Sequence, residues 1–143
     1  MGVKELIEDL ERIEKQVQAG GGKKATDDQH KKGRLTARER IDLFFDKGTF
    51  VETNMYSQHQ CHDFGMEKKR PYGDGVITGY GNVQGRPVFV YAMDFMVLGG
   101  SIGLSNASKI AQAQKLAAKT RVPMIGLVDT SGARIQEGSG TYS

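Results

Sequence analysis

The chain has 143 residues and a net charge of +3, from 20 Lys and Arg against 17 Asp and Glu. This length corresponds to one domain, and the charge is too small for a dedicated nucleic-acid-binding protein. No apolar run approaches the roughly 18 residues of a transmembrane helix, and the first residues do not form an apolar secretory signal. The single cysteine, Cys61, excludes an internal disulfide and a zinc site of several cysteines, so we expect a cytoplasmic protein.

The first 20 residues carry an apolar stripe at helical spacing. Apolar residues recur every three or four positions at Leu6, Leu10, Ile13 and Val17. This spacing predicts an amphipathic helix that ends at Gly20. The next stretch, residues 20–33, is polar and glycine-rich, and we expect an exposed hinge or linker there rather than a core element.

A second helix start lies at Thr36, which is followed by Glu39 three residues later. This pair forms a capping box, so a short helix is predicted over 36–45, with Gly48 ending it. The stretch 49–75 that follows is irregular.

Four candidate metal ligands or nucleophiles gather in this irregular stretch: His59, Cys61, His62 and Asp63. The spacing His-x-Cys-His-Asp matches no structural zinc pattern, and no second pair of ligands follows downstream. The partners of a Cys–His nucleophile pair are usually neighbours in space and not in sequence. We therefore expect a polar loop without a bound metal.

From residue 75 the pattern changes to strands and a helix. The predicted elements are an antiparallel β-hairpin over 75–94, a helix over 105–120 and a strand over 123–129. The second hairpin strand, residues 88–93, is apolar on both faces, which predicts a central, buried position. We expect Met124–Val128 to be the most buried segment of the chain.

A glycine-rich loop with Gly99, Gly100 and Ser101 joins the hairpin to the helix. A loop between a strand and a helix can direct backbone N–H groups at an anion. The spacing matches neither the dinucleotide-binding glycine pattern nor a phosphate-binding loop with its lysine, so an independent nucleotide-binding domain is disfavoured. A tight turn at positive φ would use the same glycines.

A second turn of small residues follows the last predicted strand. The strand delivers Asp129 to its carboxyl end, and Thr130, Ser131 and Gly132 come directly after it. Small residues let a ligand approach successive backbone N–H groups, as in an oxyanion hole. The segment is not a nucleophile elbow, and no histidine partner follows it. Spacing alone leaves a plain strand-to-turn transition equally open.

Five segments in order carry a resemblance to a known family: KGRLTARERIDLFFDKGTFVE, GDGVITGYG, GRPVFVYAMDF, VLGGSIG and VDTSGARIQEG. The chain resembles the carboxyltransferase β subunits of biotin-dependent acyl-CoA carboxylases, especially the β subunits of propionyl-CoA carboxylases. The α subunits of biotin-dependent acyl-CoA decarboxylases share these motifs, so the resemblance does not separate the two. Thr130 and Ser131 stand where the family usually has Ser and Gly.

The resemblance implies an α/β fold of the crotonase-like ββα spiral type, preceded by two helices. Family members are several times longer, so we expect an incomplete N-terminal half of a carboxyltransferase. Residues 1–47 would then form an N-terminal helical segment and linker, and 48–143 the start of the carboxyltransferase domain. The order strand–strand–helix–strand, found from the pattern itself, agrees with this fold.

The implied activity is carboxyl transfer between carboxybiotin, supplied by a partner domain or subunit, and the α-carbon of an acyl-CoA. Backbone N–H groups of Ser131, Gly132 and Ala133 would form part of an oxyanion site, and the loop at Gly99–Ser101 would contact acyl-CoA. Expected partners are acyl-CoA, a biotin carboxylase or biotin carrier subunit, and further copies of the full-length protein. The alternatives are a decarboxylase α subunit, or an inactive CoA-contacting or interaction module when the chain is isolated.

Overall fold

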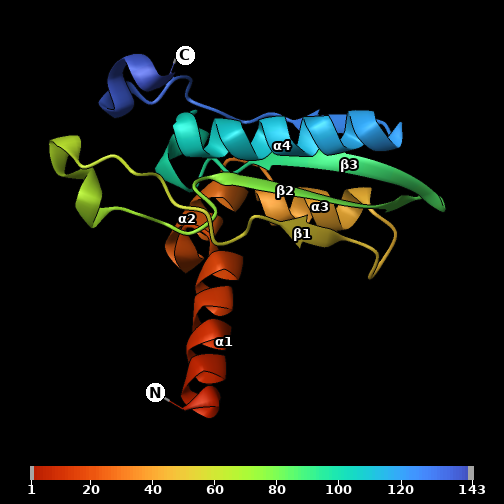
Figure 1. Cartoon of the computed structure of the whole chain (residues 1–143), viewed down its shortest axis with the longest axis horizontal. Coiled ribbons are helices and arrows are strands. Elements are labelled where there is room, and N and C mark those ends of the chain that lie inside the picture. The colour runs from red at the N-terminus through yellow and green to blue at the C-terminus, as the bar shows by residue number, and fades with distance from the viewer. Residues whose placement is uncertain (1, 142–143) are drawn as a thin grey trace.

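The structure, a computed structural model, describes residues 2–141. Its centre is a four-stranded sheet in the order β1-β2-β3-β4. The strands are β1 (Val51–Thr53), β2 (Val76–Val83), β3 (Arg86–Met93) and β4 (Met124–Leu127). The helices are α1 (Val3–Ala19), α2 (Gly22–Lys31), α3 (Ala37–Phe44) and α4 (Leu104–Thr120), with short 3-10 turns η1 (Asp63–Lys68), η2 (Leu98–Gly100) and η3 (Ile135–Thr141). Figure 1 shows α3 and α4 on opposite faces of the sheet.

The predicted hairpin is confirmed. β2 and β3 pair antiparallel from Val76↔Met93 to Val83↔Arg86. Gln84 and Gly85 form the turn, and both have positive φ, of 51° and 76°. Two successive residues of positive φ match the right-handed twist of a hairpin. The carboxylate of Asp46 accepts both turn N–H groups, from Gln84 at 2.9 Å and from Gly85 at 2.8 Å.

The core lies between α3 and the sheet. Its buried members are Ala37, Ile41, Phe45, Ile77, Val88, Val90 and Ala92. The rings of Phe45 and Phe50 stack with centroids 5.2 Å apart. β3 is the central, buried strand as predicted, with Val90 and Ala92 fully buried. Residues from both sides of the predicted boundary between 1–47 and 48–143 contribute to this core. The division of the chain at that boundary stays a prediction.

The first predicted helix is confirmed as α1, which ends before Gly20. Figure 1 shows it projecting from the body of the molecule. Val17 is buried where α1 meets the body, whereas Leu6 and Leu10 remain 53% and 46% exposed. No helix within residues 2–141 has the length and apolarity that crossing a bilayer would require.

The expectation of an exposed linker over 20–33 is wrong, because residues 22–31 form α2, so three helices and not the predicted two precede β1. Gln29 is buried, and the hydroxyl of Thr26 donates to the sulfur of Met96 at 3.7 Å. A Cβ on Gly21 would lie 2.8 Å from the backbone oxygen of Met96, so this glycine permits close packing. The polar composition hid a helix that is fixed by contacts with a distant loop.

The capping box at the start of α3 is confirmed. The N–H of Glu39 donates to the hydroxyl of Thr36 at 3.2 Å, and the N–H of Thr36 donates to the Glu39 carboxylate at 2.8 Å. Nε2 of His30 lies 2.9 Å from the same carboxylate and ties α2 to α3. Hydrogen bonding to His30 lowers the pKa of Glu39 below its ordinary value.

The strand predicted over 123–129 is confirmed as β4, but the prediction that Met124–Val128 is the most buried segment is wrong. β4 pairs parallel with β3 only, from Phe89↔Met124 to Ala92↔Leu127. Its other edge has no partner within residues 2–141. Ile125 and Val128 are therefore 39% and 59% exposed. An edge position, which an apolar run does not reveal, overrides the expectation of burial.

Candidate functional site

The two predicted loops of small residues lie side by side. The N–H of Ser131 donates to the carbonyl of Gly99 at 2.9 Å. Ile102 and Ala133 form an isolated parallel bridge: the N–H of Ile102 donates to Gly132 at 2.9 Å, and the N–H of Arg134 donates to Ile102 at 2.7 Å. The loop after β3 and the turn after β4 therefore form one continuous backbone surface.

Glycine is needed where these loops approach each other. Gly99 and Gly100 have φ of 64° and 59°. A Cβ on Gly100 would collide with the backbone oxygen of Asp129, and a Cβ on Gly99 would lie 2.8 Å from Oγ of Ser131. Both the conformation and the close packing therefore exclude larger residues.

A cavity of about 360 Å³ opens beside this surface. It is lined by Met66, Leu98, Ser101, Ser131, Ala133, Arg134, Ile135 and Gln136. Three of the six predicted site residues line it directly, and Gly99, Gly100 and Gly132 shape the adjoining turns.

The three candidate oxyanion donors differ in their hydrogen bonds. The N–H of Ser131 is engaged by Gly99, and that of Gly132 donates to the hydroxyl of Thr130 at 2.9 Å. The N–H of Ala133 has no acceptor within residues 2–141. Because the C=O of Gly132 and the N–H of Ala133 belong to one trans peptide, they point in opposite directions. The Gly132 carbonyl faces Ile102, so the Ala133 N–H points away from that loop.

Sequence reasoning missed a buried ion pair that joins the turn after β4 to the segment before β2. The side chains of Arg134 and Asp74 are 1% and 0% exposed, and Nη1 lies 2.7 Å from Oδ1. Arg134 also donates through Nε to the hydroxyl of Ser101 at 3.0 Å and through Nη2 to its carbonyl at 2.9 Å. Nη1 further contacts Glu137 at 2.9 Å. Burial raises the pKa of Asp74, and the Arg134 cation opposes that shift.

Two polar residues on the buried face of α4 were also missed. Nδ2 of Asn106 donates to the carbonyls of Asp74 at 2.9 Å and Ser101 at 2.8 Å. Nζ of Lys109 donates to the carbonyl of Gly73 at 2.9 Å and to that of Val76. Burial lowers the pKa of Lys109 to about 8. The signal was available in their helical spacing with buried Ala113 and Ala117.

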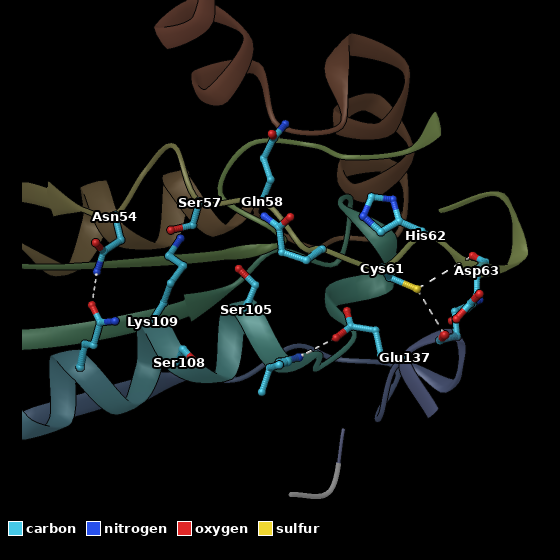
Figure 2. Close-up of a pocket in the computed structure, with 14 residues that line it drawn as sticks. Asn54, Ser57, Gln58, Cys61, His62, Asp63, Ser105, Ser108, Lys109 and Glu137 are labelled. Atoms are coloured by element: carbon cyan, nitrogen blue, oxygen red, sulfur yellow. Dashed lines mark hydrogen bonds between the residues drawn. The ribbon is translucent and has the colours of Figure 1, made fainter. Parts of the chain in front are cut away.

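A second cleft, of about 630 Å³, lies between α4 and the loop before η1. In Figure 2, Ser105, Ser108 and Lys109 come from α4, and Asn54 and Ser57 lie across from them. Most of the lining residues have polar side chains, and they include Gln58, Gln60, Cys61, His62, Asp63, Gln112, Gln136 and Glu137. Gln136 lines both cavities, so they adjoin.

The cluster around Cys61 forms a wall of this cleft. Nε2 of the fully buried His59 lies 2.6 Å from the carbonyl of Lys69, and its Nδ1 accepts from the N–H of Cys61. The thiol of Cys61 donates to the carbonyl of Gln136 at 3.3 Å, and not to a histidine. Within residues 2–141, no three His, Cys, Asp or Glu side chains are grouped as a metal site. Through its contacts with Lys69 and Cys61, the His59 ring holds the loop backbone in place.

The chain is similar to known proteins along nearly its whole length. A family model described as carboxyl transferase domain matches residues 28–142. The propionyl-CoA carboxylase beta chain of Cereibacter sphaeroides is 48% identical over 136 residues, which cover 95% of this chain and 27% of that one. The methylmalonyl-CoA decarboxylase subunit alpha of Veillonella parvula is 48% identical over 135 residues, covering 94% and 26%. The corresponding beta chain of Sus scrofa, 50% identical over 133 residues (90% of this chain, 25% of that one), is named mitochondrial.

The fold agrees with a solved structure. The transcarboxylase 12S crystal structure, described as a hexamer assembly with methylmalonyl-coenzyme A and methylmalonic acid bound, superposes with a TM-score of 0.94 at 36% identity. The match covers 99% of this chain and 28% of that one, which confirms the predicted crotonase-like fold. The chain spans about a quarter of the length of the curated relatives it matches.

Proposed function

Because the chain belongs to the carboxyl transferase domain family, we propose that it supplies part of the site where a carboxyl group passes between carboxybiotin and the α-carbon of an acyl-CoA. Carboxybiotin reaches this site from a partner domain or subunit, as a co-substrate. Loss of the α-proton leaves negative charge on the thioester oxygen, so the reaction needs fixed donors near that oxygen. No metal ion is assigned to this chain.

The observation that supports this role best is that Ala133 lines the cavity and that its N–H has no acceptor within residues 2–141. A preorganised backbone donor at such an oxyanion contributes about 10²- to 10³-fold in rate. We assign this donor role first to Ala133. The N–H groups of Ser131 and Gly132 would bind the oxyanion only if they gave up their hydrogen bonds to the Gly99 carbonyl and the Thr130 hydroxyl. Otherwise these two residues contribute by keeping the turn small.

The loop at Gly99, Gly100 and Ser101 is our proposed contact for acyl-CoA. Ser101 lines the same cavity as Ser131 and Ala133, so an acyl-CoA bound in this cavity would contact both loops. The two glycines hold this loop against the turn after β4. These residues bind and orient the substrate, while the turn stabilises its charge.

A carboxylase and a decarboxylase role are both supported, since relatives of the two kinds are each 48% identical. Both require the same enolate. The remaining alternative is a CoA-contacting or interaction module without activity of its own. We further propose assembly with copies of the complete subunit and with a biotin carboxylase or biotin carrier subunit, in the cytoplasm.

A chimera tests the function. This chain replaces the matching N-terminal segment of the Cereibacter sphaeroides beta chain, and purified chimera is assayed for carboxyl transfer from methylmalonyl-CoA to free biotin. A matched control carries the Veillonella parvula segment at the same junctions. We expect both chimeras to turn over. A folded chimera without activity, beside an active control, would refute the proposal.

The reciprocal host separates the two activities. The same chain is placed in the Veillonella parvula subunit, and kcat/KM is compared between the hosts, each normalised to its own parent. A carboxylase segment should favour the beta-chain host by at least about tenfold. The opposite preference would make the decarboxylase assignment correct. Fluorescent fusions to the chain, viewed beside a mitochondrial marker, test the cytoplasmic location.

A further inference from the structure

We propose that Arg134 is a positioning residue, whose guanidinium holds the Ala133 N–H in the direction that an oxyanion requires. This inference rests on the proposed function. Its parts are the ion pair with Asp74, the two hydrogen bonds to Ser101, and the isolated bridge between Ile102 and Ala133.

The first step concerns the backbone. The peptide that carries the Ala133 N–H is anchored at its other side, because Gly132 accepts from Ile102 at 2.9 Å. The next N–H, of Arg134, donates to Ile102 at 2.7 Å. These two bonds set the direction of the Ala133 N–H, but they belong to a single bridge with no strand on either side. Such a bridge needs a further anchor to keep its geometry.

The second step concerns the side chain. Arg134 follows Ala133 directly, and its guanidinium contacts three separate segments: Asp74 before β2, Ser101 before α4, and Glu137 in η3. A planar guanidinium with several fixed donors imposes orientation as well as distance. The side chain therefore locks the Ala133 turn against the loop that we assign to acyl-CoA.

The third step asks why a charged pair occupies this place. A buried ion pair is weak support for stability, since apolar residues of similar volume often stabilise a fold equally well. Here Oδ2 of Asp74 accepts no hydrogen bond within residues 2–141. Asp74 also has a φ of 50°, in the left-handed region that aspartate adopts more readily than most residues other than glycine. A fully buried, incompletely bonded pair fits a role in positioning better than one in stability.

The test uses the active beta-chain chimera with the substitution Arg134→Ala. Loss of orientation should lower kcat about 100-fold while KM for methylmalonyl-CoA changes less than about threefold. Arg134 is among the residues that line the cavity, so methylguanidinium that enters the truncated site from this cavity should restore kcat at least about tenfold. Arg86→Ala, at an exposed arginine of β3, is the matched control and should keep parental kinetics.

Arg134→Lys covers the case in which the alanine variant does not fold. It keeps the charge but loses the planar donors, so kcat should fall at least about tenfold at unchanged KM. A folded Arg134→Lys or Arg134→Ala chimera with kcat within about twofold of the parent overturns the inference. A loss of kcat that methylguanidinium leaves unchanged in folded Arg134→Ala also overturns it. An inactive parental chimera would instead count against the proposed function.

Discussion

Removing the positive charge of Lys109 should change how stability depends on pH. The residue is 2% exposed, and its amine donates to the backbone carbonyls of Gly73 and Val76. Burial lowers its pKa from 10.5 to about 8, against the attraction of Glu52 and Asp74. Lys109→Met keeps the length of the side chain but removes the titrating group.

The sign follows from which state holds the proton. Between about pH 8 and pH 10.5 the unfolded chain keeps the Lys109 proton while the folded chain has released it. The free energy of unfolding therefore rises with pH across this window and, for this group, is constant below it. The pKa difference corresponds to about 3 kcal/mol. Below pH 8, burial of the charged amine costs the folded state this amount.

Urea denaturation followed by circular dichroism, at steps from about pH 7 to pH 11, measures the effect. The unfolding free energy of the parent, minus that of Lys109→Met, should rise by about 3 kcal/mol from the lower to the upper end of this pH range. Lys115→Met, at an exposed lysine of the same helix, should give a profile parallel to the parent. If the Lys109→Met profile is also parallel within about 0.5 kcal/mol, the amine is not desolvated and the reasoning fails.

Three further predictions concern the capping box, the turn after β4 and the isolated chain. Thr36→Ala should lower the free energy of unfolding by about 1 kcal/mol in urea denaturation, and Thr36→Ser should restore most of it. In the active chimera, Ser131→Gly and Ser131→Ala should keep kcat/KM within about threefold, because the backbone N–H groups remain. Gly132→Val should lower kcat/KM more than about 100-fold, since φ at Gly132 is 108° and β-branched residues avoid that region. A loss of kcat/KM of about 10³ in Ser131→Ala would instead show that the Ser131 hydroxyl, and not the backbone, takes part in catalysis. The isolated chain should show no carboxyl transfer above background, because on the proposed function it supplies only part of the site, and clear turnover would contradict this.

Features determined by neighbouring residues were predictable from the sequence. The capping box needs only Thr36 and Glu39, and the hairpin needs only a two-residue turn at Gln84-Gly85 between two strand-forming segments. Each is fixed by contacts within a few positions, which pattern reasoning can read directly.

Features determined by distant residues were not. α2 reads as a linker because the contacts that fix it come from Met96. The burial of β4 depends on what lies beyond its edge, which an apolar run does not report. For the site, the two loops were found from their glycines and from the family resemblance. The Arg134–Asp74 pair was hidden, because a charged side chain gives no sign in sequence that a distant partner buries it.

The parallel pairing of β3 with β4 has a consequence for the order in which the chain folds. The hairpin closes across a two-residue turn, whereas the pairing of Phe89 with Met124 closes a much longer stretch of chain that contains the whole of α4. Longer closures carry a larger entropic cost, and hairpins form in about 1–10 μs. We expect β4 to join the sheet after the hairpin and to leave it first in local opening. The turn that presents Ala133 therefore gains its order last, and its amide protons should exchange with solvent ahead of those in β2 and β3.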